Sequence, residues 1–239
     1  MLFRSYASLD PRMKVRDLIA EPLKAFGVSQ EERSGTVSRV AQQVGLREDQ
    51  LDLYPHEFSG GQRQRICIAR AIALQPDFIV CDEPVSALDV SIQAQVLNLL
   101  QELQKAAGLT YLFISHDLSV VHHISDRVCV MYLGQVCEIG TTEEIFFHTR
   151  HPYTRFLLEA TPSLDPDQDP GQEETVLSTD LPSPINPPSG CRFHTRCPYA
   201  KEICARQVPA CEGDDSHACA CHFPRKTNWA EKDPGRNNT

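Results

Sequence analysis

The chain has 239 residues, of which 41% are hydrophobic and 23% are charged, as is ordinary for a soluble globular protein. Its formal net charge is −9 and its pI about 5.4, which argues against a surface for duplex nucleic acid. No apolar run approaches the roughly 18 residues that span a bilayer, and the first residues hold too short an apolar stretch for a secretory signal. We therefore expect a cytosolic protein that reaches a membrane only through a partner.

Helical periodicity dominates the first part of the chain. Apolar residues recur at three- and four-residue spacings in 15–26 and 34–46, which predicts helices there. A third helix is expected over 63–75, because it follows a double glycine and ends before Pro76. The sequence thus predicts a helical region up to about residue 75.

Strands and helices alternate after that region. Two short apolar runs rich in β-branched and aromatic residues, 77–84 and 110–117, predict buried parallel strands. The amphipathic segment 91–108 between them predicts a crossover helix. This order indicates an α/β fold with a parallel sheet and right-handed crossovers. A short helix, a two-stranded hairpin and two more short helices are expected over 119–126, 127–140, 142–148 and 153–161.

Composition divides the chain further. An acidic, proline-rich stretch after Ser163 has little to bury and predicts a linker. A cysteine-rich segment follows it, and the last residues are expected to be disordered. The expected parts are a helical region at 1–75, an α/β core at 76–162, a linker at 163–190, a cysteine-rich C-terminal extension at 191–225 and a tail at 226–239.

The stretch Ser59-Gly60-Gly61-Gln62 has the features of an element that meets a phosphate. Adjacent glycines let the backbone approach a ligand closely, and hydrogen-bonding side chains flank them. The helix that follows would point its free N–H groups and the positive end of its dipole at the same place. The 239 residues nevertheless contain no G-x-x-x-x-G-K-[ST] loop, since the dipeptide Gly-Lys occurs nowhere among them.

The first predicted strand ends in the acidic pair Asp82-Glu83. Ligands of α/β sheets bind at strand ends, where one carboxylate can hold Mg²⁺ and the next can orient or deprotonate an attacking water. The alternative is a solvated acidic pair without a role. When the pair is considered alone, this alternative has a probability of about one half. His116 ends the second strand and could hydrogen-bond a γ-phosphate, although a lone histidine is more often a satisfied surface residue.

The order of these motifs resembles that of the ATP-binding cassette (ABC) ATPases. The stretch FSGGQ is similar to their signature motif and FIVCDE to their Walker B strand with the glutamate after it. The stretch SALD, residues 86–89, is similar to their D-loop, and His116 to their switch histidine. The resemblance covers about residues 6–160 and implies a P-loop NTPase domain, present in part, with a helical subdomain.

The resemblance implies a role for each motif residue. Asp82 would serve Mg²⁺, Glu83 would be the general base for water, and His116 would contact the γ-phosphate. In this family two domains sandwich two ATP molecules head to tail, so the signature motif would face ATP bound to a second subunit. The implied nucleotide-binding residues are Ser59, Gly60, Gly61, Gln62 and Asp89.

Longer stretches narrow the resemblance to oligopeptide and dipeptide importer ATPases. Residues 54–100 are similar to that subfamily over a continuous run, and residues 151–205 are similar to its C-terminal extension. This implies a peripheral subunit on the cytoplasmic side of a bacterial inner membrane that uses ATP and Mg²⁺ to energise peptide import. The implied partners are a second ABC ATPase subunit, two transmembrane permease subunits and, indirectly, an extracytoplasmic peptide-binding protein, without nucleic acid.

The chain departs from the family at one point. The family's Walker A loop lies upstream of the stretch that residues 1–11 resemble, so the sequence resembles the C-terminal two-thirds of such an ATPase. We therefore expect no ATP hydrolysis by this chain alone, and a strand ending in Asp82 that lacks a neighbour on one side. Two alternatives stay open: a catalytically inactive interaction or metal-binding module, and a cassette ATPase of DNA repair or translation.

Ten cysteines are present, which is a high count for a cytosolic chain. Four of them are scattered among apolar neighbours and are expected to be small buried side chains. These are Cys67, Cys81, Cys129 and Cys137. The other six fall between Cys191 and Cys221, where reducing conditions disfavour disulfides and favour a metal site.

Four cysteines of the extension are candidate metal ligands: Cys191, Cys197, Cys204 and Cys221. Five, six and sixteen residues separate them, which does not match the paired C-x₂₋₄-C spacing of zinc sites. Four thiolates on an irregular loop suit a [4Fe–4S] cluster, and the resemblance points the same way, because this extension carries these cysteines in peptide-importer ATPases. Judged by ligand type and spacing alone, the probability is about one half for a cluster and about one sixth for zinc, and the rest is for thiols that bind no metal.

Overall fold

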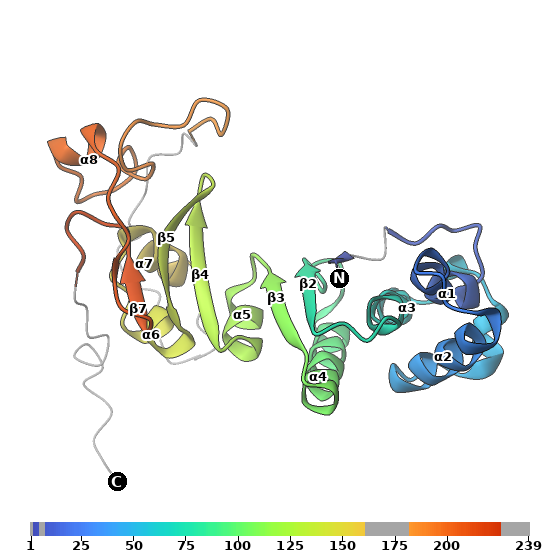
Figure 1. The fold of residues 1–239 in the computed structure, drawn as a ribbon. Coiled ribbons are helices and arrows are strands. Elements are labelled where there is room, and N and C mark those ends of the chain that lie inside the picture. The colour runs from blue at the N-terminus through green and yellow to red at the C-terminus, as the bar shows by residue number, and fades with distance from the viewer. Residues whose placement is uncertain (1, 5–7, 161–181, 226–239) are drawn as a thin grey trace, which may run out of the picture. The chain divides into compact units, whose positions relative to one another are not determined.

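The structure, a computed structural model, describes residues 8–160 and 182–225 and the backbone of residues 2–4 (Figure 1). It divides into two compact units, residues 1–124 and 125–239. Most of the expected linker and the whole expected tail lie outside the described residues. The boundaries expected at residues 75 and 162 stay predictions.

The first unit begins with a helical bundle, as the sequence predicts. Helices α1 and α2 each contact α3, and apolar side chains from all three form one core. The second helix begins earlier than the expected residue 34, because Ser29 and Glu32 form a capping box that starts it. The bounds are α1 Val15–Ala25, α2 Gln30–Gln43, the 3₁₀ turns η2 Glu48–Asp52 and η3 Pro55–Glu57, and α3 Gly60–Ile72.

A parallel sheet with strand order β1-β2-β3 completes the first unit. Val80 in the central strand lies opposite Leu2 on one side and Leu112 on the other. The strand that ends in Asp82 therefore has neighbours on both sides, and the expectation that it lacks one is wrong. The bounds are β1 Leu2–Arg4, β2 Phe78–Asp82, α4 Val90–Ala107, β3 Thr110–Ile114 and α5 Leu118–Ile124.

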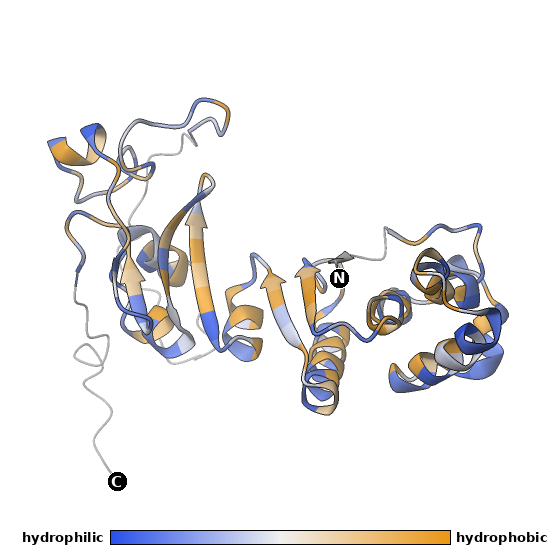
Figure 2. Ribbon diagram, viewed as in Figure 1, coloured by the Kyte–Doolittle hydropathy of each residue, from blue (hydrophilic) through white to orange (hydrophobic). Residues whose placement is uncertain are grey.

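Helix α4 makes the crossover between β2 and β3, as its amphipathic pattern predicts. Asp89 caps its start, and Gly108, with a φ of 65°, ends it. Figure 2 shows hydrophobic residues concentrated on strands β2 and β3 and along part of α4. This arrangement places the carboxyl ends of β2 and β3 side by side, which is the edge where ligands of such sheets bind.

The second unit holds an antiparallel sheet with strand order β4-β5-β7-β6. The predicted hairpin is confirmed as β4 and β5, with a bulge at Cys137 because Val130 pairs with Glu138 and Met131 with Val136. The bounds are β4 Arg127–Tyr132, β5 Gln135–Thr141, α6 Thr142–Phe147, α7 Pro152–Glu159, α8 Glu202–Arg206, β6 Glu212–Gly213 and β7 His217–Cys219.

The cysteine-rich extension adds two of these strands, so it is not the wholly irregular loop that the sequence suggests. Glu138 of β5 lies opposite Cys219 of β7, and Gly140 lies opposite His217. A Cβ atom on Gly140 would lie 2.8 Å from the carbonyl oxygen of Ser216, so only glycine allows this close approach. Hydrogen bonding of the backbone thus anchors the extension to the hairpin.

Candidate functional site

The loop after β2 carries the expected general base. Glu83 adopts a left-handed backbone conformation with a φ of 47°. Residues other than glycine rarely adopt this conformation, and they keep it where the surrounding structure enforces it. Its N–H donates to the carbonyl oxygen of Ile114 at 3.0 Å, so the end of β3 fixes the residue that follows β2. Asp82, the expected Mg²⁺ ligand, is the last residue of β2 and lies opposite Ile114.

The structure brings Glu83 and His116 together from the ends of two strands. The Oε1 atom of Glu83 lies 3.1 Å from Nδ1 of His116. Both side chains are exposed, at 49% and 73%, so the contact contributes little to stability. A carboxylate and an imidazole that meet at this edge with open faces are placed to act on a bound molecule.

The signature segment forms the start of α3, as expected, but its polar side chains bond to each other. Ser59 N–H donates to Gln62 Oε1 at 3.1 Å, and Gln62 N–H donates to Ser59 Oγ at 3.4 Å. This capping box explains why the helix begins at Gly60. The other N–H groups of the first turn have no partner within the helix, which leaves them suited to an anion.

The glycines of the signature segment also serve packing. A Cβ atom on Gly61 would lie 2.4 Å from Cγ2 of Ile92 in α4, and one on Gly60 would lie 3.2 Å from Cδ2 of Leu88. The first turn of α3 therefore lies directly against the D-loop and the start of α4. Asp89, another expected nucleotide-binding residue, is the N-cap of α4 and accepts a hydrogen bond from Ile92 N–H at 3.0 Å. That bond and one from Ser91 hold the pKa of Asp89 below its ordinary value.

Two glutamines near this site were not among the site residues that the sequence predicts. Gln64 on α3 is buried, and its side-chain amide donates to the carbonyl oxygen of Pro84. Gln93 on α4 donates to the carbonyl oxygens of Val85 and Leu88, each at 3.1 Å. Polar residues among the apolar positions of two amphipathic helices are the signal that could have indicated such buried contacts.

The four candidate cysteines come together in the second unit. Cys191, Cys197, Cys204 and Cys221 line one cavity of about 20 Å³, and His151 lines it as well. Burial raises the pKa of the Cys191, Cys197 and Cys221 thiols, and backbone N–H groups that bond to their sulfur atoms oppose this. Within residues 8–160 and 182–225, however, no three or more His, Cys, Asp or Glu side chains are arranged to hold a metal ion.

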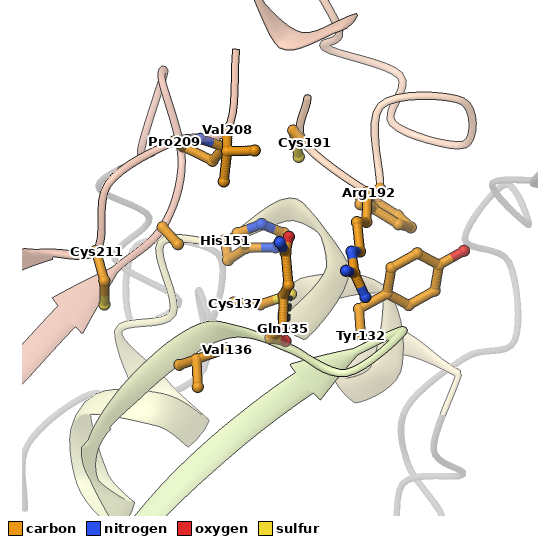
Figure 3. Close-up of a pocket in the computed structure, with 12 residues that line it drawn as sticks. Tyr132, Gln135, Val136, Cys137, His151, Cys191, Arg192, Val208, Pro209 and Cys211 are labelled. Carbon is orange, nitrogen blue, oxygen red and sulfur yellow. Dashed lines mark hydrogen bonds between the residues drawn. The ribbon is translucent and has the colours of Figure 1, made fainter. Parts of the chain in front are cut away.

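A larger cavity of about 190 Å³ adjoins the first, since both are lined by His151, Cys191 and Phe193. Figure 3 shows its lining side chains, which come from the β4–β5 hairpin, His151 and the cysteine-rich extension. Burial lowers the pKa of His151 to about 4, so this imidazole is neutral. Its Nδ1 accepts a hydrogen bond from Tyr153 N–H at 3.0 Å, which places the ring proton on Nε2.

The scattered cysteines behave as expected with one exception. Cys67, Cys81 and Cys137 are buried, and burial raises the pKa of these thiols to about 11, 12 and 12. Cys129 is exposed, because it points to the uncovered face of β4, and the prediction that it is buried is wrong. None of the four lines the cavity of the candidate ligands, although Cys137 lines the larger one.

A buried hydrogen-bonded network that no sequence pattern indicated joins the extension to β5. His217 Nε2 lies 2.7 Å from Glu138 Oε1, and His217 Nδ1 lies 2.8 Å from Glu144 Oε2. Glu138 also accepts hydrogen bonds from Thr149 Oγ1 and His151 N–H, at 2.8 Å and 3.2 Å. This carboxylate therefore ties β5, β7 and the start of α7 together.

Two family models match the chain. The model described as "ABC transporter" matches residues 1–86, and the model described as "Oligopeptide/dipeptide transporter, C-terminal region" matches residues 137–204. The second match begins in β5 and ends at Cys204, so it takes in five of the twelve residues that line the larger cavity and three of the four candidate cysteines.

Known proteins resemble the chain over most of its length. The oligopeptide transport ATP-binding protein OppF of Escherichia coli (strain K12) is 54% identical over 224 residues, which are 92% of this chain and 67% of that protein. The di/tripeptide transport ATP-binding protein DppF of Pseudomonas aeruginosa (strain UCBPP-PA14) is 51% identical over 224 residues, 93% of this chain and 69% of that protein. The chain thus spans about two-thirds of the length of these relatives.

A solved structure has a similar fold. This structure is cbiO1 from Clostridium perfringens, part of the ABC transporter complex cbiONQ. It matches with a TM-score of 0.55 and 26% sequence identity, over 61% of this chain and 58% of that one. The expected ABC ATPase fold is confirmed as a partial P-loop NTPase domain, and the chain belongs to the family of ATP-binding proteins of ABC transporters, in its oligopeptide/dipeptide branch.

Proposed function

We propose that this chain is an ATP-binding subunit of an ABC importer for oligopeptides or dipeptides and couples ATP hydrolysis to transport. The contact between Glu83 and His116 at 3.1 Å, beside Asp82, carries the proposal. The relatives of this chain at about 50% identity are named as peptide transport ATP-binding proteins, which supports peptides as the cargo. The subunit would lie at the cytoplasmic face of a bacterial membrane and bind permease subunits there.

The site residues would divide the chemistry among them. The Asp82 carboxylate would hold Mg²⁺, for which oxygen ligands are suited, and bound Mg²⁺ would neutralise the charge that develops on the phosphates. Glu83 would take a proton from the attacking water as a general base. His116, whose Nδ1 lies 3.1 Å from Oε1 of Glu83, would donate a hydrogen bond to the γ-phosphate.

The signature segment would serve a second ATPase subunit. The first-turn N–H groups of α3 and its positive dipole end favour an anion, while no Gly-Lys dipeptide occurs in these 239 residues. We infer that this helix end faces ATP whose phosphates are cradled by the loop of a partner ATPase. Ser59 and Gln62 would exchange their mutual cap bonds for contacts to that nucleotide.

The test is ATP turnover by the transporter assembled with this subunit. Glu83→Gln should lower the turnover at the site that Glu83 serves by about 10²–10⁴-fold, because an amide cannot accept the proton. Glu102→Gln, at an exposed position of α4, is the matched control and should leave turnover unchanged. If Glu83→Gln has no effect but Ser59→Ala lowers turnover, the chain is instead an inactive module that only offers its signature segment to a partner.

The four-cysteine cavity favours a second activity, the binding of a [4Fe–4S] cluster or a single metal ion in the extension. The donor chemistry fits, because four thiols line one cavity and the N–H of Phe223 donates to Cys221 Sγ at 3.4 Å. The space fits less well, since about 20 Å³ is close to the room for one water. Binding of either centre would therefore require the thiols to rearrange.

The nature of this centre can be measured directly. Anaerobically prepared protein with a [4Fe–4S] cluster should be brown and contain close to four iron and four sulfide per chain, as that cluster requires. Colourless protein with one zinc per chain would replace the cluster by a structural zinc site. Protein without metal after anaerobic preparation would contradict both.

A further inference from the structure

Side-chain amides hold the loop that joins β2 to α4. Gln64 is only 1% exposed, and its Nε2 donates to the carbonyl oxygen of Pro84. Gln93 Nε2 donates to the carbonyls of Val85 and Leu88 from the other side, each at 3.1 Å. The loop is therefore fixed between α3 and α4 by hydrogen bonds that neither helix needs for its own backbone.

The amide of Gln64 acts next to the expected general base. Pro84 directly follows Glu83, whose backbone has the left-handed φ of 47°. The Glu83 N–H donates to the carbonyl oxygen of Ile114 in β3 at 3.0 Å. One residue later along the chain, the carbonyl oxygen of Pro84 accepts from the side-chain amide of Gln64. A sparsely populated backbone conformation persists only when its surroundings fix it, and these two bonds do so.

The same glutamine belongs to the signature helix. Gln64 lies three residues after Gly61, so both occupy the same side of α3. Gly61 fits against Ile92 of α4 so closely that a Cβ atom would lie 2.4 Å from Cγ2 of that residue. The start of α3, the loop after Glu83 and the start of α4 are thus packed as one body.

We propose that Gln64 is a positioning residue that couples the N-terminus of α3 to the Glu83 carboxylate. When α3 closes on a nucleotide held by a partner subunit, the amide of Gln64 carries the displacement to the Pro84 carbonyl and so to Glu83. This proposal rests on the proposed ATPase function. Under it, the signature segment, which faces the nucleotide at one site, controls the general base Glu83, which serves a different site.

Hydrogen–deuterium exchange of the full chain tests the hydrogen bond without any need for catalysis. Gln64→Leu keeps the size of the side chain but removes the donor, so the amide N–H groups of Glu83 and of residues 85–88 should exchange roughly tenfold faster. Gln101→Leu is the matched control, because Gln101 Nε2 also donates to a backbone carbonyl, that of His123 at 3.4 Å, but far along α4 from the loop. It should leave exchange at 83–88 unchanged.

Turnover by the assembled transporter tests the coupling. Gln64→Leu should lower kcat at least about tenfold and leave the KM for ATP unchanged, because the base is misplaced only in the transition state. Gln64→Glu adds a signature that packing alone does not produce. A neutral carboxyl group can donate to Pro84 and an ionised one cannot, so turnover by this variant should fall with rising pH relative to the unsubstituted complex.

The outcomes separate this proposal from the function on which it rests. Faster exchange at 83–88 with an unchanged kcat overturns the coupling and leaves the ATPase function standing. Unchanged exchange in Gln64→Leu overturns the proposal outright. An unsubstituted complex without turnover refutes the ATPase function, while exchange still decides whether Gln64 holds the loop. If Gln64→Leu does not fold, Gln64→Met, whose flexible side chain fits more easily, takes its place in both measurements.

Discussion

The imidazole of His217 lies 2.7 Å from the carboxylate of Glu138, and both side chains are at most 1% exposed. This contact closes β7 onto β5, and the other ring nitrogen of His217 lies 2.8 Å from Oε2 of Glu144. A polar group buried this deeply depends on its hydrogen-bond partner, so the pair makes docking of the extension sensitive to either residue.

The first prediction concerns this pair. His217→Leu should lower the free energy of unfolding of the second unit by about 1–3 kcal/mol, because it removes a buried hydrogen-bond partner of the Glu138 side chain. Chemical denaturation measures the change. His222→Leu is the control, because Nε2 of His222 lies 2.9 Å from the carbonyl oxygen of Gln207, and loss of that hydrogen bond should cost only about 0.5–1.5 kcal/mol. Equal losses in the two variants would contradict the prediction.

The second prediction concerns the close approach of α3 and α4. Gly61→Ala should destabilise the first unit by about 1–3 kcal/mol, because the new methyl group would overlap Ile92 Cγ2. Ile92→Ala combined with Gly61→Ala should recover part of this loss, since it removes the overlapped atom. Gly35→Ala in α2 meets nothing within 4 Å and should stabilise the helix by about 0.5–1 kcal/mol. A double variant less stable than the sum of its single changes would rule out the steric cause.

The third prediction concerns pH. The pKa of His151 is lowered to about 4 in the folded chain, below the value of about 6.5 expected when unfolded. Between these values the unfolded state binds a proton that the folded state does not, so stability falls as the pH drops below about 6.5. The loss from this group should reach about 2 kcal/mol by about pH 5.

A variant isolates that contribution. His151→Asn keeps an acceptor at the N-cap of α7 but cannot be protonated, so its stability should fall less steeply between pH 7 and pH 5. The control is His56→Asn, at an exposed position, which should follow the pH dependence of the unsubstituted chain. Parallel stability curves for His151→Asn and the unsubstituted chain would show that burial does not suppress protonation of His151.

The fourth prediction concerns the cysteines. In the proposed centre each of the four cysteines that line the small cavity would supply one thiolate, so replacing any one of them by Ser should lower the metal content of anaerobically prepared protein by at least half. The exposed Cys129 and Cys211 lie outside that cavity, so Cys129→Ser and Cys211→Ser should retain the metal. Iron, zinc and sulfide analysis of the purified variants measures this. Loss of metal in Cys211→Ser would mean that the ligand set has been chosen wrongly.

The sequence by itself determined the types of the elements and the family. Apolar runs gave β2 and β3, and an amphipathic period gave α4, because these patterns are set by neighbouring residues along the chain. The capping residues that begin α3 and α4 are equally local. The motifs retained their order and spacing, and so they identified the ABC ATPase family before any contact was known.

Only the tertiary structure decided which distant residues meet. The Glu83–His116 contact joins residues 33 apart in sequence and the Gln64–Pro84 bond joins residues 20 apart, and neither has a local pattern. Strand β7 is three residues long, too short for alternation to be recognised, so its pairing with β5 and the burial of His217 against Glu138 were not predicted. Pairing of short strands and burial of polar side chains depend on the free energy of the whole packed unit, which no window of sequence contains.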